Sequence, residues 1–276
     1  MSFDFNTQII EEFRANRGRV GGPFEGARLL LLSTTGVRSG EQHTVPLGYL
    51  PDGGEQVLVI ASANGAARHP DWFHNLVAEP VVNVEDGIFT YEARATVLEG
   101  AERDAAWARA VEADPAWGDY QARTSRVIPV VALRQTGGGP PPASSFGEAL
   151  RMIHDAFRRE LVLIRKEIAE SGPGLGAQLR VNCLTLCQGL HIHHSHEDRG
   201  LFPAVSAQHP ELAEVMDRLR DEHEKVAALL ARLQEVISGE NVDSPSVLKE
   251  VEELASAVEQ HLDYEEEQLI PVLDGA

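Results

Sequence analysis

Four histidines and two carboxylates fall within eight residues of the segment His191-Ile192-His193-His194-Ser195-His196-Glu197-Asp198-Arg199-Gly200-Leu201-Phe202-Pro203. On a helix, His193 and Glu197 lie one turn apart on the same face, which is the spacing that two ligands on one helix need to bind one metal ion. The apolar pair Leu201-Phe202 followed by Pro203 predicts that the helix stops there. The segment therefore predicts the end of a metal-binding helix.

Long helical patterns fill the C-terminal half of the chain, and glycine and proline occur only at the breaks between them. The apolar periodicity predicts helices near residues 146–170, 177–197, 210–238 and 245–269. Helices of this length joined by short breaks are typical of a four-helix bundle. We therefore expect an all-α domain over residues 146–276.

Each expected helix places one histidine on its apolar face when about 100° is assigned to each residue. On the first helix, for example, His154 is surrounded by Phe146, Leu150 and Leu161. Two of the helices add a carboxylate one turn after the histidine. The residues that this periodicity directs into the bundle are His154, His193, Glu197, His223, His261 and Glu265. The same angles place His194 at the border of the apolar face, and direct His191, His196 and Glu266 away from it.

A metal centre explains these inward polar residues better than packing does. A single histidine on an apolar face is usually a core residue with a satisfied hydrogen bond. Here four helices each provide one, and buried carboxylates without partners would be costly. Imidazole and carboxylate ligands without thiolate favour iron, manganese or zinc. Carboxylates that can bridge favour two ions in the core of a bundle, and we expect two irons.

The first part of the chain changes to strand periodicity after a helix at residues 6–17. Apolar or β-branched runs between Gly and Pro turns predict strands at 27–33, 44–50, 57–62, 81–85, 88–98 and 127–134, with helices at 70–78, 100–112 and 115–123. These strands predict a small antiparallel sheet or barrel. Residues 136–145, rich in Gly and Pro, predict a linker that does not pack. We therefore expect an α+β chain with domains at residues 1–135 and 146–276.

The chain has 24 basic and 43 acidic residues and a formal net charge of -19 at pH 7. This charge argues against nucleic acid and anionic membrane surfaces as partners. No apolar run approaches the length of about 18 residues that a membrane span requires, and the start Met1-Ser2-Phe3-Asp4 is too polar for a signal peptide. We expect no integral membrane segment and a cytoplasmic protein, in which Cys183 and Cys187 are packed thiols rather than a disulfide.

Two turns in the N-terminal half have the composition of anion-binding loops. Residues 34–40 join two strands with glycines and Arg38, and residues 61–65 end a strand with exposed amides. Both turns have the features of a phosphate site. Ordinary turn chemistry explains either one when it is taken alone.

The C-terminal motifs resemble those of the hemerythrin-like domains over most of residues 146–273. The resemblance rests on the order His154, His193-x3-Glu197 with Leu-Phe-Pro, His223, and His261-x3-Glu265 with Leu-Ile-Pro. It implies a di-iron centre with bridging carboxylates that acts in O2 carriage, oxygen or redox sensing, NO binding or peroxide chemistry. Oxygen-carrying members have a second histidine four residues after the third-helix ligand, where this chain has Ala227. One iron then lacks a nitrogen ligand unless His194 or water replaces it, and an open position favours reduction of O2, NO or peroxide over reversible carriage.

The N-terminal motifs resemble those of the deazaflavin-dependent nitroreductase family over residues 5–134. The motifs are Thr34-Thr35-Gly36-Val37-Arg38-Ser39-Gly40, Val45-Pro46-Leu47, Ala61-Ser62, His69-Pro70-x-Trp72-Phe73-x-Asn75-Leu76, Glu79-Pro80-x-Val82, Glu102-Arg103, Trp117-x-Asp119-Tyr120-Gln121 and Arg126-x-Ile128-Pro129-Val130. The resemblance implies a split β-barrel, often paired as a homodimer, that binds the deazaflavin coenzyme F-420. Such proteins transfer a hydride to a small-molecule acceptor, either a quinone or a nitroaromatic compound.

The same resemblance assigns roles to individual residues. The candidate catalytic residues are Ser62, expected near the reactive ring, and Trp117 and Tyr120, expected on the substrate side. Trp72 and Asn75 are expected to hold the helix that backs the cofactor, with core packing as the alternative for Trp72 and Trp117. The candidate cofactor-binding residues are Thr35, Gly36, Arg38, Ser39, Gly40, Pro46, Ala61, Ser62, Ala63, Asn64, Trp72 and Asn75.

The chain departs from this family at charged positions. Val37, His43 and Ala63 stand where members commonly have cations, and only Arg38 is kept. Because the coenzyme carries a phosphate and a polyglutamate tail, the change predicts weaker binding, a truncated cofactor, or a different group such as FMN or haem.

The leading interpretation is a two-domain redox protein, in which an F-420-dependent oxidoreductase is fused to a di-iron module that binds or reduces O2, NO or peroxide. The alternative is a non-enzymatic sensor of oxygen, NO or iron, or an iron-storage protein, whose barrel has lost its cofactor. A hydride carrier exchanges electron pairs and iron exchanges single electrons. Direct transfer between the two sites therefore requires a one-electron intermediary.

Overall fold

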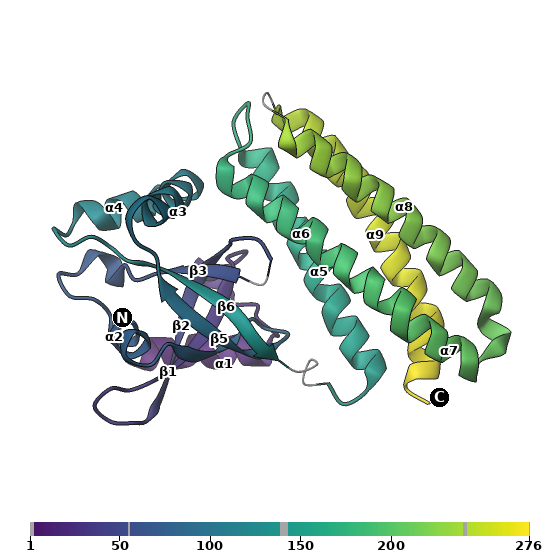
Figure 1. Cartoon of the computed structure of the whole chain (residues 1–276), viewed down its shortest axis with the longest axis horizontal. Helices are drawn as coiled ribbons and strands as arrows, with labels where there is room; N and C mark the ends of the chain where they lie inside the picture. The colour runs from purple at the N-terminus through teal and green to yellow at the C-terminus, as the bar shows by residue number, and fades with distance from the viewer. Residues whose placement is uncertain (1–2, 55, 139–142, 240–241, 276) are drawn as a thin grey trace. The chain divides into compact units, whose positions relative to one another are not determined.

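The computed structural model describes residues 3–54, 56–138, 143–239 and 242–275 of the chain. The chain divides into two compact units, Met1–Pro142 and Ala143–Ala276. The first unit combines a β-barrel with helices and the second is helical, so the predicted α+β class is confirmed (Figure 1). Among the described residues, no helix has both the length and the apolar composition needed to cross a bilayer.

The described strands of the first unit are antiparallel and close into a barrel in the order β1-β2-β3-β6-β5-β4. Their bounds are β1 (Leu29–Thr35), β2 (Gln42–Pro51), β3 (Gln56–Ile60), β4 (Val81–Glu85), β5 (Thr90–Val97) and β6 (Val130–Gly138). The helices of this unit are α1 (Phe3–Ala15), α2 (Asp71–Ala78), α3 (Gly100–Ala113) and α4 (Ala116–Ala122). Short 3₁₀ turns occur at Gly22–Phe24 and Ala63–Gly65.

The first four residues of strand β1, Leu29 to Leu32, are all leucine because both faces of the strand are covered there. Leu30 and Leu32 pack in the barrel interior, whereas Leu29 and Leu31 pack against α1. Helix α2 contributes Trp72 to the interior cluster, which agrees with core packing for this side chain. Helices α1 and α2, which both pack on the barrel, therefore lie on either side of the β1–β2 turn.

Strand β6 is longer than the sequence predicted. Gly137 pairs with Glu92 and Gly138 with Tyr91, so residues 136–138 belong to the barrel although they were assigned to the linker. Strand pairing uses backbone groups, and residues without apolar side chains can therefore extend a strand at the barrel end. Residues 139–142 of the predicted linker lie outside the described residues.

The second unit is the predicted helical bundle, and Figure 1 shows its long helices side by side. Its helices are α5 (Phe146–Glu170), α6 (Ala177–His196), α7 (Phe202–Gln208), α8 (Ala213–Ser238) and α9 (Ser244–Leu273), with a 3₁₀ turn at Pro210–Leu212. Leu161, Leu233 and Leu262, on three different helices, are fully buried in one core. Cys183 and Cys187 are buried free thiols of the same core, as expected.

The prediction that Leu-Phe-Pro stops the second bundle helix was wrong. Helix α6 continues through a π-helical turn, Glu197–Leu201, into α7. Pro203 is the second residue of α7 and follows the π-helical turn directly, so it lies where the helical hydrogen-bond pattern changes rather than inside a regular α-helix. Phe202 is fully buried and fixes the turn. Pro271 likewise lies inside α9, which continues to Leu273.

The predicted inward orientation of Phe146 was also wrong, because its side chain is 77% exposed. Phe146 is the first residue of α5, so only one side of it has helical neighbours. Leu150 and Leu161, further along the same helix, are buried as predicted.

Candidate metal centre and cofactor pocket

The bundle buries the polar residues that the helical periodicity directed inward. His154, His223 and His261 come from α5, α8 and α9, and each is at most 4% exposed. Glu197, the first residue of the π-helical turn, is 4% exposed, and Glu265 of α9 is fully buried. The side chain of His193 on α6 is 9% exposed. His191 and His196, which were predicted to face away, are exposed.

These side chains form two groups that each have the composition of a metal site. One contains His154, His193, Glu197 and Glu265, and the other contains His194, His223 and His261. Within each group, one ligand atom of every member lies within 4.8 Å of the others. His194 is 5% exposed, so the structure moves it from the border of the apolar face into the interior.

Both carboxylates of the first group also lie close to the second group. Glu197 Oε1 is 3.1 Å from His193 Nε2, and its Oε2 is 3.6 Å from His223 Nε2. Glu265 Oε2 is 3.4 Å from His154 Nε2 and 3.6 Å from His261 Nε2. Each carboxylate therefore reaches one imidazole of each group, which is the placement that a bridging ligand needs.

A second layer of acidic side chains orients three of the imidazoles. His154 Nδ1 lies 2.9 Å from Glu266 Oε1, and His223 Nδ1 lies 2.9 Å from Asp198 Oδ1. His261 Nδ1 lies 3.1 Å from Glu222 Oε2. A carboxylate at Nδ1 fixes the ring and leaves Nε2 free to bind a metal.

This second layer did not follow from the helical periodicity. The periodicity directs Glu266 away from the core and assigns no role to Asp198 or Glu222. The available signal was adjacency, because each of these acids is next in sequence to a residue directed inward, as in Glu197-Asp198, Glu222-His223 and Glu265-Glu266.

Several of the inward atoms have no hydrogen-bond partner in the protein. Those of the two groups are His154 Nε2, His193 Nε2, His194 Nε2 and both carboxylate oxygens of Glu197 and of Glu265. A buried polar atom without a partner costs on the order of 1–3 kcal/mol. Since nitrogen and carboxylate oxygen atoms converge without partners, this donor set fits bound metal, and it lacks the thiolates that would favour soft ions.

Burial also shifts the pKa values of these groups. It raises the pKa of Glu197 well above its ordinary value, and the neighbouring Glu265 raises it further. Burial lowers the pKa of His193 and of His194, so both imidazoles are neutral near pH 7. For His154, burial acts to lower the pKa, but contacts with Glu265 and Glu266 outweigh it and raise the pKa.

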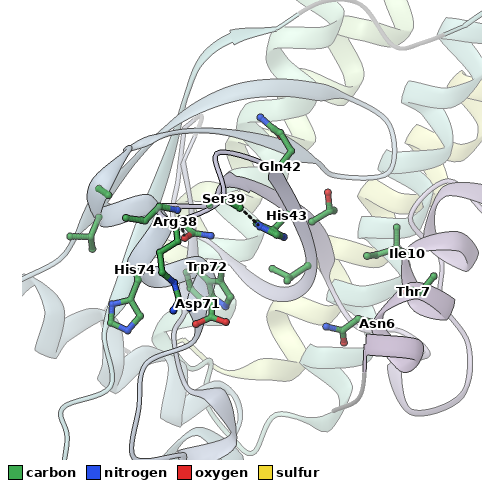
Figure 2. Close-up of a pocket in the computed structure, with 17 residues that line it drawn as sticks. Asn6, Thr7, Ile10, Arg38, Ser39, Gln42, His43, Asp71, Trp72 and His74 are labelled. Carbon is green, nitrogen blue, oxygen red and sulfur yellow. Dashed lines mark hydrogen bonds between the residues drawn. The ribbon is translucent and has the colours of Figure 1, made fainter.

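The barrel unit has a pocket of about 1050 Å³ beside the β1–β2 turn. Figure 2 shows the pocket between helices α1 and α2. The residues that line it include Asn6, Thr7 and Ile10 from α1 and Asp71, Trp72 and His74 from α2. The turn contributes Arg38 and Ser39, and β2 contributes Gln42 and His43. Of the candidate cofactor-binding residues, those that line the pocket are Gly36, Arg38, Ser39, Trp72 and Asn75.

The β1–β2 turn is held to α2 by Asn75. Its Oδ1 accepts a hydrogen bond from Val37 N at 3.2 Å, and its Nδ2 donates to Thr34 Oγ1 at 3.1 Å. Gly36 packs closely, since a Cβ there would lie 2.5 Å from Ser39 Oγ and 2.8 Å from His43 Nε2. The turn therefore has one defined shape at the edge of the pocket.

The remaining candidate residues are outside the described lining of the pocket, although Thr35 and Gly40 belong to or adjoin the same β1–β2 turn. Thr35 pairs with Gln42 at the ends of β1 and β2, and Pro46 pairs with Leu31. Gly40 has φ +71° in the β1–β2 turn. Ala61, Ser62, Ala63 and Asn64 form a separate turn after β3, outside the described lining of the pocket.

This second turn is held by Arg126, to which the sequence analysis gave no separate role. Its guanidinium donates to the carbonyl oxygens of Ala61, Ser62 and Ala66 at 3.1, 2.6 and 2.8 Å. A Cβ on Gly65 would lie 2.6 Å from the Tyr120 carbonyl oxygen, so α4 packs directly on the turn.

Helix α4 carries two of the candidate catalytic residues. The rings of Trp117 and Tyr120 lie 5.9 Å apart, edge to face. The third candidate, Ser62, lies in the turn on which α4 packs. The structure therefore brings the three candidates to one side of the barrel.

Comparison with known proteins identifies both units. Residues 7–135 match the family described as F420H(2)-dependent quinone reductase. A protein of that name from Mycobacterium tuberculosis is 38% identical over 125 residues, which cover 44% of this chain and 83% of the relative. The chain belongs to this quinone reductase family. Residues 146–273 match the hemerythrin HHE cation binding domain, so the reductase domain is followed by a hemerythrin domain.

Other relatives match the reductase domain. A putative F420H(2)-dependent quinone reductase of Mycobacterium tuberculosis is 37% identical over 105 residues, 38% of this chain and 87% of the relative. A solved F420-H2 dependent reductase is 39% identical and covers 39% of this chain and 94% of its own, with a TM-score of 0.36. A solved structure described as a domain-swapped dimer is 35% identical to this chain, with a TM-score of 0.38. The match covers 48% of this chain and 96% of the chain in that structure.

Proposed function

We propose that the protein is a two-domain oxidoreductase. The reductase domain oxidises reduced coenzyme F-420 and transfers the hydride to a small acceptor, a quinone or a nitroaromatic compound. The hemerythrin domain holds two irons and binds or reduces O2, NO or peroxide. The observation that supports the first activity is 38% identity to a quinone reductase over most of that relative. The second is supported by the unpartnered buried nitrogen and oxygen atoms of the bundle.

The coenzyme would bind the barrel at the β1–β2 turn, where Arg38 is the candidate cation. Gly36 and Ser39 offer a closely packed turn at the pocket edge, and Arg38 supplies a positive charge for the phosphate or the glutamate tail. Asp71 lines the same pocket, and its negative charge partly offsets the positive charge of Arg38. When bound, the deazaflavin supplies a hydride. The protein holds and orients it, with Ser62 as the residue that we place next to the reactive ring and Trp117 and Tyr120 on the acceptor side.

A turnover assay tests the reductase function. Reduced F-420 is mixed with menadione and the protein, and the deazaflavin absorbance is followed. We expect oxidation that depends on both enzyme and acceptor. Arg38→Ala should raise KM for reduced F-420 more than it lowers kcat, because Arg38 lines the pocket. Arg19→Ala, which removes an exposed arginine outside the described lining, is the matched control. No oxidation above background would refute this function.

The hemerythrin domain fits a pair of metal ions through its converging ligands. The residues that would hold them are His154, His193, Glu197, His223, His261 and Glu265. When bound, two irons supply one-electron redox chemistry for a small oxidant. The surrounding bundle buries these side chains and holds each carboxylate within reach of imidazoles from both groups.

Metal analysis tests the di-iron assignment. Protein reconstituted with ferrous iron should hold about two irons per chain and, in air, show the near-ultraviolet band of an oxo-bridged pair. The double variant His193→Ala with Glu197→Ala should lose both properties. The double variant His191→Ala with His196→Ala, which removes exposed histidines from the same helix, should keep them. Equal iron content in the two variants would refute the assignment.

A sensor or iron store without reductase activity is the second candidate. It is favoured by Val37 and His43, which line the pocket where relatives of this kind commonly have cations. A sensor would bind iron normally and leave reduced F-420 unoxidised. The substitutions Val37→Lys and His43→Arg discriminate further, because restored cations should tighten coenzyme binding only if the coenzyme occupies this pocket.

A further inference from the structure

We propose that His194 is a direct ligand of one of the two ions and replaces the second α8 histidine that this chain lacks. This inference rests on the proposed di-iron function. His194 follows directly after His193 in α6, so two neighbouring residues of one helix would serve two different ions.

The rings of His194, His223 and His261 form a nearly even triangle. Their centroids are separated by 4.2 Å between His194 and His223, 5.1 Å between His194 and His261, and 4.7 Å between His223 and His261. Their ligand atoms lie within 4.8 Å of one another. Three imidazoles this close together could bind one metal ion through three nitrogen atoms after small side-chain adjustments.

The three histidines differ in the hydrogen-bond partners that the protein itself provides for their ring nitrogens. His223 Nε2 and His261 Nε2 lie 3.1 Å apart, so one can donate to the other. Their Nδ1 atoms contact Asp198 and Glu222. His194 Nε2, in contrast, is buried and has no partner. A purely structural role explains His223 and His261, but it leaves the ring nitrogen of His194 desolvated for no gain.

The geometry of α8 explains why the nitrogen comes from α6. Ala227, four residues after His223, is exposed and has no ligand atom. Leu219, four residues before His223, is fully buried and closes that side of the site with an apolar side chain. The position left for a third nitrogen is the α6 face that carries His194. The ion that the sequence analysis expected to be short of a nitrogen ligand then has three imidazoles.

Metal titration of full-length protein tests the role of His194. Metal-free wild type, His194→Ala and His194→Asn are titrated anaerobically with ferrous iron, and bound iron and the oxo-bridge band after exposure to air are measured. We expect about two irons in wild type. In both variants the second iron should bind at least tenfold more weakly, since even an outer-layer ligand contributes roughly 10–100-fold. Added imidazole should restore it in His194→Ala, where the removed ring leaves space.

Matched controls separate this inference from the proposed function. His191→Ala and His196→Ala remove exposed histidines of the same helix and should bind two irons normally. Far-ultraviolet circular dichroism of each metal-free variant checks that the bundle has folded. If wild type binds two irons and folded His194→Ala binds both with unchanged affinity, His194 is not a ligand and only this inference fails. If wild type does not bind two irons, the di-iron function itself fails.

Discussion

At the scale of single residues, acidic side chains around the candidate metal centre occupy two distinct positions. Glu197 and Glu265 lie between imidazole groups, where they are almost completely buried. Asp198, Glu222 and Glu266 lie behind the imidazoles, with side chains 41%, 18% and 17% exposed. The inner pair can bind metal, and the outer acids orient the rings while they remain in contact with solvent or with arginine. Arg158, for example, donates to Glu266 Oε1 at 2.7 Å.

Substitution of an outer acid should weaken iron binding without removing a ligand. We expect Glu266→Gln to lower iron affinity by about 10–100-fold, because the neutral amide holds His154 Nδ1 less strongly. Glu267→Gln, at the next and exposed position, is the control. The measurement is anaerobic titration with ferrous iron, and equal affinities for the two variants would contradict an orienting role for Glu266.

Iron affinity should rise with pH because the pKa of Glu197 is raised by burial and by Glu265. Below this raised pKa the carboxyl group of Glu197 keeps its proton in the metal-free protein, and iron must displace that proton to bind. Above it, the carboxylate is already available. Calorimetric titration in two buffers of different ionisation enthalpy, repeated over a range of pH, should detect release of this proton below the raised pKa. No release, with affinity independent of pH, would contradict a buried carboxyl ligand at Glu197.

At the scale of elements, two irregular segments carry the candidate sites. The π-helical turn Glu197–Leu201 begins at the inner carboxylate, and its second residue, Asp198, contacts His223 Nδ1. The turn after β3 includes Ala63 and Asn64 with φ of 46° and 55°, a conformation that costs energy for residues other than glycine. Arg126 stabilises that turn through its hydrogen bonds to three carbonyl oxygens.

Removal of Arg126 should loosen the turn and with it the coenzyme site. We expect Arg126→Ala to destabilise the reductase domain by about 1–3 kcal/mol, since several charged hydrogen bonds are lost. Binding of F-420 should weaken more than that of menadione. Arg134→Ala, which removes an exposed arginine of β6, is the control for thermal unfolding and binding. Unchanged F-420 binding in a stable Arg126→Ala protein would contradict this role for the turn.

The sequence predicted the features that depend on local periodicity. The inward direction of His154, His223 and His261 follows from 3.6 residues per turn, and these residues are buried. The continuation of α6 beyond Leu201 did not follow from that period, because a π-helical turn inserts an extra residue. The interior position of His194 depends on packing against α8 and α9, which a single-helix projection does not contain.

The barrel also has features that local sequence patterns do not predict. Its strands were recognisable from apolar runs and turn residues, but the closure of β1 on β4 and of β3 on β6 joins segments far apart in the chain. The hydrogen bonds of Asn75 to Val37 and Thr34, which shape the pocket edge, also cross about forty residues. Such contacts are set by topology, and no local pattern contains them.

At the scale of the whole molecule, the chain consists of two compact units with separate cores. The candidate iron ligands all come from the second unit and the candidate coenzyme residues all come from the first. Each cofactor should therefore stabilise only the unit that binds it.

Calorimetry should resolve two unfolding transitions with different ligand dependence. Iron at about 100 times its dissociation constant should stabilise the bundle by about 2.7 kcal/mol, and F-420 should shift the other transition only. Removal of iron with a chelator should return the bundle transition to its lower temperature. One transition that both ligands shift equally would contradict independent units.

Anomalous diffraction at the iron edge, from crystals of iron-reconstituted protein, tests the di-iron assignment most directly. We predict two peaks about 3.5–4 Å apart inside the bundle. One should lie next to His154 and His193, and the other next to His194, His223 and His261, with Glu197 and Glu265 between the peaks. A bundle core without an iron peak, or iron bound only by exposed histidines such as His191 and His196, would contradict it.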